Sequence, residues 1–340
     1  MKIAFLLPGP FAVGSPGNGV RVQAEKQADA LEALGHPVAR LDPWQRYDVA
    51  DFDVVQFFLG GTHQYSVEHD ARRRYKMLVF APTIDSQESN ARYRFAARLG
   101  RILPKVFTTP SIHAAQAQGS DLVIVRSTEE QGRLIQGLGA NPNKVSIVLN
   151  GVTPPEPADP QIARRELALP EEFALHVSAY TQGRKNVARL IKAIGPTGIP
   201  LVIAGHAMEG SDKSALIDAA RPFPQIRFFG WLSHETLESL YAACKVFCLP
   251  SLFEGTGLVA LEAAVHGARV VITQNGGPPD YFLDLAEYVD PGSVASIRAA
   301  IMRAWEAPDS DKLKTHVLNN LTWENSARSL VAAYQKHRRA

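Results

Sequence analysis

The chain has 340 residues, of which 46% are hydrophobic and 21% charged, and its formal net charge is +2. These values exclude disordered and collagen-like classes, give no indication of a nucleic-acid partner, and favour two domains, because this length exceeds what one hydrophobic core usually organises. No apolar run is long enough to span a bilayer, and the run that opens the chain is too short before Pro8 for a signal peptide, so we expect a cytoplasmic protein.

Apolar runs rich in β-forming residues alternate with helical patterns through the first half of the chain. The runs are Ile3 to Leu7, Val54 to Phe58, Leu78 to Phe80, Asp121 to Val125 and Val145 to Leu149, with helical patterns near Val20 to Leu34 and from Glu129. This alternation is typical of a doubly wound parallel sheet.

A glycine-rich loop, Gly14 to Gly19, follows the first of these runs. Glycine permits a close approach of the backbone to a ligand, so this loop is a candidate for closing over phosphate groups. The loop lacks the G-x-G-x-x-G spacing of a dinucleotide fingerprint, which argues against a nicotinamide enzyme.

A basic helical pattern stands in the middle of the first half. Its cations, opposite the apolar positions Phe95, Leu99, Ile102 and Val106, are Arg94, Arg98, Arg101 and Lys105. A basic amphipathic helix can lie on an anionic membrane surface, which would bring a lipid-linked acceptor to this domain. The alternative is an ordinary solvated helix face, so peripheral membrane contact is one of two open interpretations.

The segment Asn150 to Pro160 is crowded with glycine, proline and other turn residues, which indicates an interdomain linker. The βα alternation restarts after it. Its strands are Phe173 to Ser178, Leu201 to Ala204, Ile226 to Phe229, Val246 to Leu249 and Ala268 to Thr273, with helices from about Asn186 and near Glu235 to Cys244. We therefore predict a first domain over residues 1–152, a second over 153–318, and a helical tail over 319–340.

Two cations follow the first strand of the second domain, in the loop that carries Arg184, Lys185 and Asn186. Arginine offers a planar fork of donors and lysine a compact charge, so a loop at the carboxyl end of a strand that holds both suits a phosphate. A solvated pair of cations is the alternative.

The segment Ser251 to Glu262 is the most informative of the chain. It runs from a β-type run through glycines into a helical pattern, and therefore spans a strand-to-helix corner whose first N–H groups suit a diphosphate. Glu254 precedes the helix and Glu262 lies about 10 Å further along its axis. Two carboxylates at that separation can accept hydrogen bonds from two separate sets of hydroxyls, such as those of a sugar ring and of a ribose. Ordinary solvated glutamates beside a turn are the alternative.

The run Leu249 to Ala264, with Gly267 to Ile272 and Gly276 to Asp280, resembles the signature of the retaining glycosyltransferases of family 4, which have the GT-B fold. The resemblance implies an α/β architecture of two tandem Rossmann-like domains with a central interdomain cleft, and a last helix that crosses back to the first domain. It also implies that Glu254 holds the donor sugar, that Glu262 binds the ribose, and that further donor contacts come from Gly19, Arg184, Lys185, Gly255, Thr256, Gly257, Leu258 and Val259.

Catalytic groups are harder to assign from the sequence. The family often has a histidine after a first-domain strand, where this chain has Thr83 and Asp85 instead. Asp85 and His113 are the catalytic candidates, with a structural role as the alternative for each. We expect no metal ion and no other cofactor, because Arg184, Lys185 and a helix terminus are available to neutralise a diphosphate.

The resulting prediction is a retaining glycosyltransferase that moves a sugar from a nucleoside diphosphate sugar to a glycan, lipid-linked or small-molecule acceptor in polysaccharide or glycoconjugate biosynthesis. Two alternatives stay open: a nucleotide-sugar epimerase or hydrolase of the same fold, and a noncatalytic subunit that binds nucleotide sugar.

Overall fold

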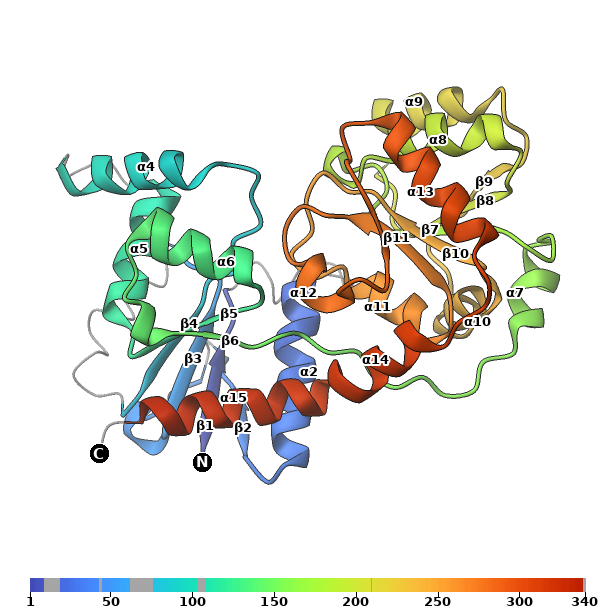
Figure 1. Ribbon diagram of the computed structural model, residues 1–340. Helices are drawn as coiled ribbons and strands as arrows, with labels where there is room; N and C mark the ends of the chain where they lie inside the picture. Colours follow the sequence, from blue (N-terminus) through green and yellow to red (C-terminus); the bar gives the residue numbers. More distant parts are fainter. Residues whose placement is uncertain (9–18, 43–44, 62–75, 103–107, 209, 339–340) are drawn as a thin grey trace. The chain divides into compact units, whose positions relative to one another are not determined.

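The structure is a computed structural model that describes residues 1–8, 19–42, 45–61, 76–102, 108–208 and 210–338 (Figure 1). The chain divides into two compact units, the first formed by residues 1–151 with 323–340 and the second by residues 152–322. We expected the second domain to end at 318; the structure extends it to Thr322, because helix α14 (Lys312–Asn320) contacts α11 (Leu258–Val265) and α12 (Pro278–Phe282) of the second unit.

The first unit is built on a parallel sheet whose strand order is β2-β1-β3-β4-β5-β6. Its elements in chain order are β1 (Ile3–Leu6), α2 (Gly19–Ala33), β2 (Val38–Arg40), β3 (Val54–Phe58), β4 (Leu78–Ala81), α4 (Asn90–Ile102), α5 (Thr109–Gly119), β5 (Leu122–Val125), α6 (Thr128–Gly132), β6 (Val145–Ile147) and, from the end of the chain, α15 (Trp323–His337).

Alternate side chains of these strands enter two separate cores, as the two-residue period of a strand requires. On one face, Ile3 and Phe5 pack with α2 and with Leu330 and Tyr334 of α15. On the other face, Ala4 belongs to a core that includes residues of α4 and α5. The last helix is thus part of the first unit, and the Tyr334 hydroxyl donates to Oε1 of the buried Gln56 at 2.7 Å.

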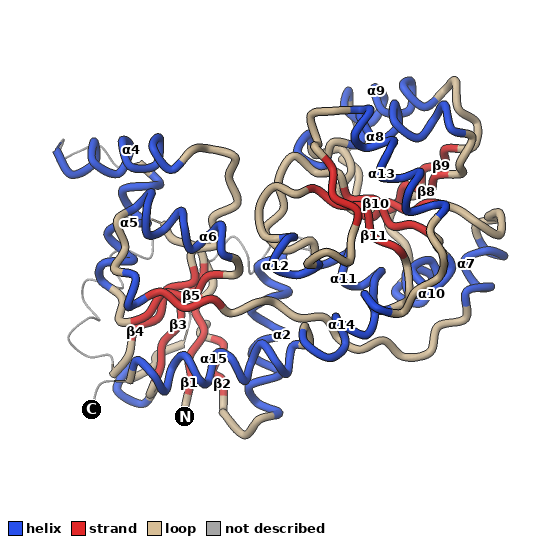
Figure 2. Tube along the Cα trace, viewed as in Figure 1, coloured by secondary structure: helices blue, strands red, loops and turns tan. Residues whose placement is uncertain are grey.

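The second unit repeats the plan of strands flanked by helices (Figure 2). Its strand order is β12-β11-β10-β7-β8-β9, with parallel pairing throughout the described strands. Its remaining elements are α7 (Pro160–Glu166), β7 (Ala174–Val177), α8 (Val187–Ile194), β8 (Leu201–Ala204), α9 (Ser211–Ala220), β9 (Ile226–Phe228), α10 (His234–Ala243), β10 (Val246–Leu249), β11 (Arg269–Thr273), β12 (Glu287–Val289) and α13 (Val294–Glu306). Each unit is a parallel-sheet, Rossmann-like α/β domain, which confirms the predicted fold class.

Strand order fixes where a ligand site can form in the second unit. The chain leaves β7 toward β8 and β9 on one side, then returns to add β10, β11 and β12 on the other. The loops after β7 and β10 therefore diverge from adjacent strands. In open α/β sheets, the crevice outside the carboxyl ends of strands at such a reversal is where ligands bind.

The two chain segments that join the units lie side by side. Val152 forms a parallel bridge with Thr322, and its N–H donates to the Leu321 carbonyl at 2.8 Å. Over the described residues, no helix is both long and apolar enough to cross a membrane.

Candidate functional site

A buried ion pair lies at the strand reversal of the second unit. The Lys185 ammonium, in the loop after β7, is 2.6 Å from Oε1 of Glu254, in the loop after β10. Lys185 is 8% exposed and Glu254 6% exposed. Attraction between the two charges offsets part of the cost of removing water around each, and removing either partner would leave an unpaired buried charge at the carboxyl edge of the sheet. The structure thus brings together two residues that the sequence assigned to one site.

Asn186 fixes the position of Lys185. Its backbone is left-handed at φ +61°, a conformation that asparagine tolerates better than most residues. Its buried side-chain N–H₂ group donates to the carbonyls of Pro250 and Pro291, each at 2.8 Å. The Leu252 N–H donates to the Arg184 carbonyl at 2.8 Å. These bonds join the loops after β7, β10 and β12.

Glu254 is held from the opposite side by the loop after β11. The Glu254 N–H donates to the Asn275 carbonyl at 3.2 Å, and the Gly277 N–H donates to the Glu254 carbonyl at 3.0 Å. Gly276, between them, has φ +102°, and a Cβ there would lie 2.0 Å from the Glu254 carbonyl oxygen. Only glycine fits this position without moving the backbone of Glu254.

Helix α11 begins beside the ion pair. Gly257 caps it in a left-handed conformation at φ +81°, where a Cβ would meet Ile272 Cδ1 at 2.9 Å. The backbone N–H groups of Leu258 and Val259 belong to the first turn, whose N–H groups have no acceptor within the helix and carry the positive end of its dipole. Gly255 and Thr256 are buried, and the Thr256 hydroxyl is 3.3 Å from the Tyr281 hydroxyl.

The two remaining predicted donor residues of this unit differ in exposure. The Arg184 side chain is 54% exposed, 3.9 Å from Glu254 and within hydrogen-bond distance of Gln182. Glu262 is half-buried on α11 and accepts a hydrogen bond from the Tyr241 hydroxyl at 2.9 Å. Burial and the neighbouring carboxylate of Glu262 raise the pKa of Tyr241 well above its usual value, so this hydroxyl stays a donor.

His176 was missed at the sequence level. It is a fully buried residue of β7, and Nδ1 lies 2.7 Å from the Cys248 carbonyl while Nε2 lies 2.7 Å from the Ser178 hydroxyl. Because a carbonyl only accepts, Nδ1 carries the proton and Nε2 accepts from Ser178. Burial lowers the pKa of His176 to about 4, which keeps the ring neutral. A histidine in an apolar run carries no sequence signal that distinguishes it from ordinary core.

Asp85 belongs to an ionic cluster in the first unit. Its Oδ1 is 2.7 Å from the Arg126 guanidinium, which also lies 3.1 Å from Glu130. Arg126 and Glu130 are buried, whereas the Asp85 side chain is 41% exposed. Thr83, two residues earlier, has φ +56°, which is rare for a β-branched residue. Asp85 is therefore an accessible carboxylate at the carboxyl end of β4, held by a buried arginine.

His113 is less accessible. It is 8% exposed on α5, its ring contacts Phe80, and a Cβ on Gly60 would lie 2.3 Å from its Cδ2. Burial lowers the pKa of His113 to about 4. Gly19, the other predicted residue of this unit, is the exposed first residue of α2, and the preceding residues of its loop lie outside the described part of the chain.

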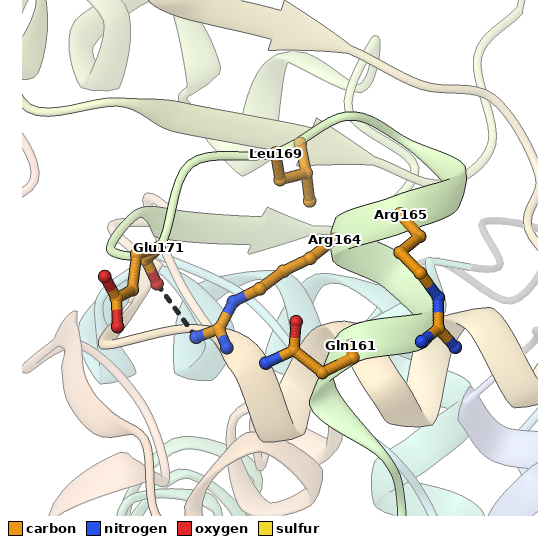
Figure 3. Close-up of a pocket in the computed structure, with 5 residues that line it drawn as sticks. All are labelled: Gln161, Arg164, Arg165, Leu169 and Glu171. Carbon is orange, nitrogen blue, oxygen red and sulfur yellow. Dashed lines mark hydrogen bonds between the residues drawn. The ribbon is translucent and has the colours of Figure 1, made fainter.

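A separate depression in the second unit is lined by Gln161, Arg164, Arg165, Leu169 and Glu171 (Figure 3). Its residues precede β7, so they lie toward the amino ends of the strands, opposite the edge that carries Lys185 and Glu254. The Arg164 guanidinium is bound to the Glu171 carbonyl at 2.9 Å. Among the described residues, no group of three His, Cys, Asp or Glu side chains is arranged to hold a metal ion.

Residues 159–317 match the family described as glycosyl transferases group 1. The chain is 28% identical over 195 residues to the O-antigen chain mannosyltransferase B of Escherichia coli, covering 54% of this chain and 51% of that protein. It is 27% identical over 250 residues to a D-inositol 3-phosphate glycosyltransferase of Rhodococcus jostii, covering 64% of this chain and 52% of that protein. The chain thus spans about half the length of these curated relatives.

Solved structures share the fold over nearly the whole chain. Sucrose-phosphate synthase from Thermosynechococcus elongatus has a TM-score of 0.76 at 18% identity and covers 99% of both chains. Anabaena HepE in complex with UDP and glucose has a TM-score of 0.62 at 19% identity and covers 99% of this chain and 95% of its own. The fold is GT-B, and the similarity to glycosyl transferases group 1 lies in the second unit.

Proposed function

We propose that this protein, whose second unit carries the match to group 1 glycosyltransferases, is a retaining glycosyltransferase of family 4 that uses a nucleoside diphosphate sugar. The observation that carries the proposal is the Lys185–Glu254 pair at the strand reversal, beside the first turn of α11. That position combines a cation for a phosphate, a carboxylate for sugar hydroxyls and backbone N–H groups for the diphosphate oxygens. The acceptor is a glycan, a lipid-linked molecule or a small molecule.

The diphosphate lies, in this proposal, against Arg184, Lys185 and the N–H groups of Leu258 and Val259. Arg184 is exposed enough to reach an incoming phosphate. Charge on the diphosphate increases as the bond between sugar and oxygen breaks, and fixed positive groups stabilise that charge. Because two cations and a helix terminus supply this stabilisation, the proposed reaction needs no metal ion.

The two glutamates bind hydroxyls at the two ends of the donor. Glu254 accepts from the hydroxyls of the donor sugar, and its buried position removes competing water. Glu262 accepts from the ribose, with the Tyr241 hydroxyl holding its other oxygen. A nucleoside diphosphate sugar is the ligand class that offers hydroxyls on both sides of a diphosphate. The UDP-bound HepE structure, a protein of the same fold, supports this class.

In the transfer step, the acceptor hydroxyl attacks the sugar carbon on the face from which the diphosphate departs, and the departing phosphate oxygen takes the acceptor proton. The bond from sugar to phosphate breaks, the bond from sugar to acceptor oxygen forms, and the configuration is retained. This route requires little chemistry from protein side chains, because the departing phosphate itself takes the proton. Asp85 is our first candidate for contacting the acceptor, because it is accessible, while the buried His113 is the second.

A thermal-shift screen of nucleoside diphosphates and their sugars tests the donor class. A ligand at 100 times its Kd stabilises the folded state by about 2.7 kcal/mol, which corresponds to a rise of roughly 5–10 °C for a domain of this size. We expect the nucleotides of one base to raise the unfolding temperature of the wild-type protein by this amount and to leave that of a Glu262→Ala variant unchanged. No shift with any nucleotide at millimolar concentration would overturn the proposal.

Product analysis with the stabilising sugar nucleotide separates transfer from the alternatives. We expect an α-linked product from an α-linked donor, formed only with acceptor and at the same rate in the presence of a chelator. Free or isomerised sugar without acceptor would identify a hydrolase or an epimerase. Binding without turnover across a broad acceptor panel would identify a noncatalytic subunit.

A further inference from the structure

Helix α4 of the first unit turns large apolar side chains outward. Phe95 is 68% exposed and Ile102 is 74% exposed, whereas Ala97 is buried. Phe95 and Ile102 are seven residues apart, which is two helical turns, so they lie on one stripe of the helix. The apolar positions of this amphipathic helix are therefore not all used by the core. Figure 1 shows α4 at the periphery of the first unit.

The inward side of α4 has its own partners. The Arg133 guanidinium lies over the Tyr93 ring at 4.9 Å from its centroid, and the Asn90 amide donates to Gln136 at 3.1 Å. The Ala96 carbonyl accepts from the Thr108 hydroxyl at 3.1 Å. These contacts fix the orientation of the helix, so the exposure of its other side is set by the fold of the unit.

Positive charge surrounds the exposed apolar stripe. The helix contains no acidic residue, and its sequence carries four arginines. We expected the arginines opposite the apolar positions, but the helical period instead places Arg98 on the stripe between Phe95 and Ile102, with Arg94 beside it. Arg94 and Arg98 are both exposed, and among the described residues neither has a carboxylate within ion-pair distance. Arg92 is paired with Glu88 at 2.8 Å. The Arg101 side chain and Lys105 lie outside the described residues.

We propose that this outward face of α4, formed by Arg94, Phe95, Arg98 and Ile102, docks on an anionic lipid surface. Phenylalanine and isoleucine enter the boundary between headgroups and acyl chains, while arginine stems extend along apolar surface and place their charge among the headgroups. The uncompensated positive charge selects an anionic bilayer over a neutral one. The inference goes beyond sugar transfer, because it assigns a surface of the first unit that takes no part in donor binding.

Vesicle sedimentation of the full chain tests the proposal without donor or acceptor. At low salt we expect binding to vesicles of phosphatidylcholine with one third phosphatidylglycerol, and none to phosphatidylcholine alone. Each arginine near a charged surface changes the partition constant roughly fivefold, so an Arg94→Gln, Arg98→Gln variant loses about thirtyfold. A Phe95→Ser, Ile102→Ser variant loses tenfold or more, because both side chains no longer enter the bilayer.

Matched controls change the same residue types elsewhere on the surface. Ile217→Ser on α9 removes a half-exposed apolar side chain, and Arg328→Gln on α15 removes an exposed arginine. Both should bind vesicles as wild type does. All four variants should keep the wild-type unfolding temperature, because the altered side chains are exposed.

Three outcomes would overturn the proposal that this face docks on lipid: the wild-type protein fails to bind anionic vesicles, it binds neutral vesicles as tightly as anionic ones, or the α4 variants bind anionic vesicles as tightly as wild type does. Self-association through this face without vesicle binding would show a protein interface instead and equally overturn the proposal. None of these outcomes bears on donor binding, which the nucleotide screen measures separately.

Discussion

Replacing Glu254 by glutamine tests the buried ion pair of the second unit. The change keeps the size of the side chain and removes its charge, so the Lys185 ammonium, 8% exposed, is left beside a neutral amide. Removing one partner of a buried pair costs about 3–5 kcal/mol. For a domain of about 150–250 residues, each kcal/mol lowers the unfolding midpoint by roughly 2–4 °C. We therefore expect the second unit to unfold at least about 6 °C lower and sugar transfer to be lost.

A double variant, Lys185→Met with Glu254→Gln, separates stability from function. It removes both charges, and a buried ion pair replaced by neutral groups of similar volume often costs little or nothing. The double variant should therefore regain most of the lost unfolding temperature, measured by calorimetry, while transfer and the nucleotide-induced thermal shift stay absent. If Glu254→Gln instead has the unfolding temperature and the transfer rate of wild type, the Lys185–Glu254 pair neither stabilises the second unit nor binds the donor.

Three further results are expected. In Gly276→Ala, the added methyl group would lie 2.0 Å from the Glu254 carbonyl oxygen. We therefore expect a stability loss of about 2 kcal/mol or more and, in an initial-rate assay, a transfer rate at least tenfold lower. Wild-type stability and rate would contradict the close contact between Gly276 and the Glu254 carbonyl. Because His176 has a folded pKa of about 4 against an unfolded value near 6.5, the unfolded state binds the extra proton between these values, so its contribution of about 3 kcal/mol is complete above pH 6.5 and lost as the pH falls to 4. The buried His113, whose pKa is also about 4, adds a similar loss to wild type and variant alike. Urea unfolding at pH 6.5 and pH 4 should therefore show a stability loss about 3 kcal/mol larger in wild type than in His176→Gln, and equal losses would contradict the assignment. Asp85→Asn should keep the unfolding temperature within about 2 °C of wild type, because the Asp85 carboxylate is 41% exposed. The variant should lower kcat/KM for the acceptor at least tenfold and leave donor affinity unchanged. An unchanged kcat/KM for the acceptor would show that Asp85 does not contact it.

The sheets could be predicted from the sequence because buried parallel strands are continuous apolar runs. Val54–Phe58, Leu201–Ala204 and Val246–Leu249 have the predicted bounds. The strands β2 and β12 were not predicted, since each has three residues at a sheet edge and carries a charged residue, so its pattern does not stand out. Helix α15 was predicted from its period, which placed Ala327, Leu330, Val331 and Tyr334 on one face; this face is buried except for Val331, which is partly buried.

The sequence predicted which residues form the candidate site, but not which of them contact one another. Strand ends and loop composition placed Lys185 and Glu254 at one edge of a parallel sheet. That the two neutralise each other at 2.6 Å depends on loop conformations set by Asn186 and Gly276, which no local pattern specifies. The Arg126 cluster was missed for a related reason, because a buried arginine beside an apolar strand resembles a surface residue until its carboxylate partners are placed.

The composition of the first unit has a consequence for protein synthesis. Its core is complete only when α15 packs on α2 and on the sheet, with the Ser326 hydroxyl accepting from Gln27 at 3.2 Å. Every residue of the second unit leaves the ribosome before that helix does. The second unit can therefore fold while translation continues, whereas the first unit keeps part of one apolar face of its sheet, beside α2, uncovered until α15 has been released. Chaperone binding to nascent chains should accordingly focus on the part of the protein that is made first.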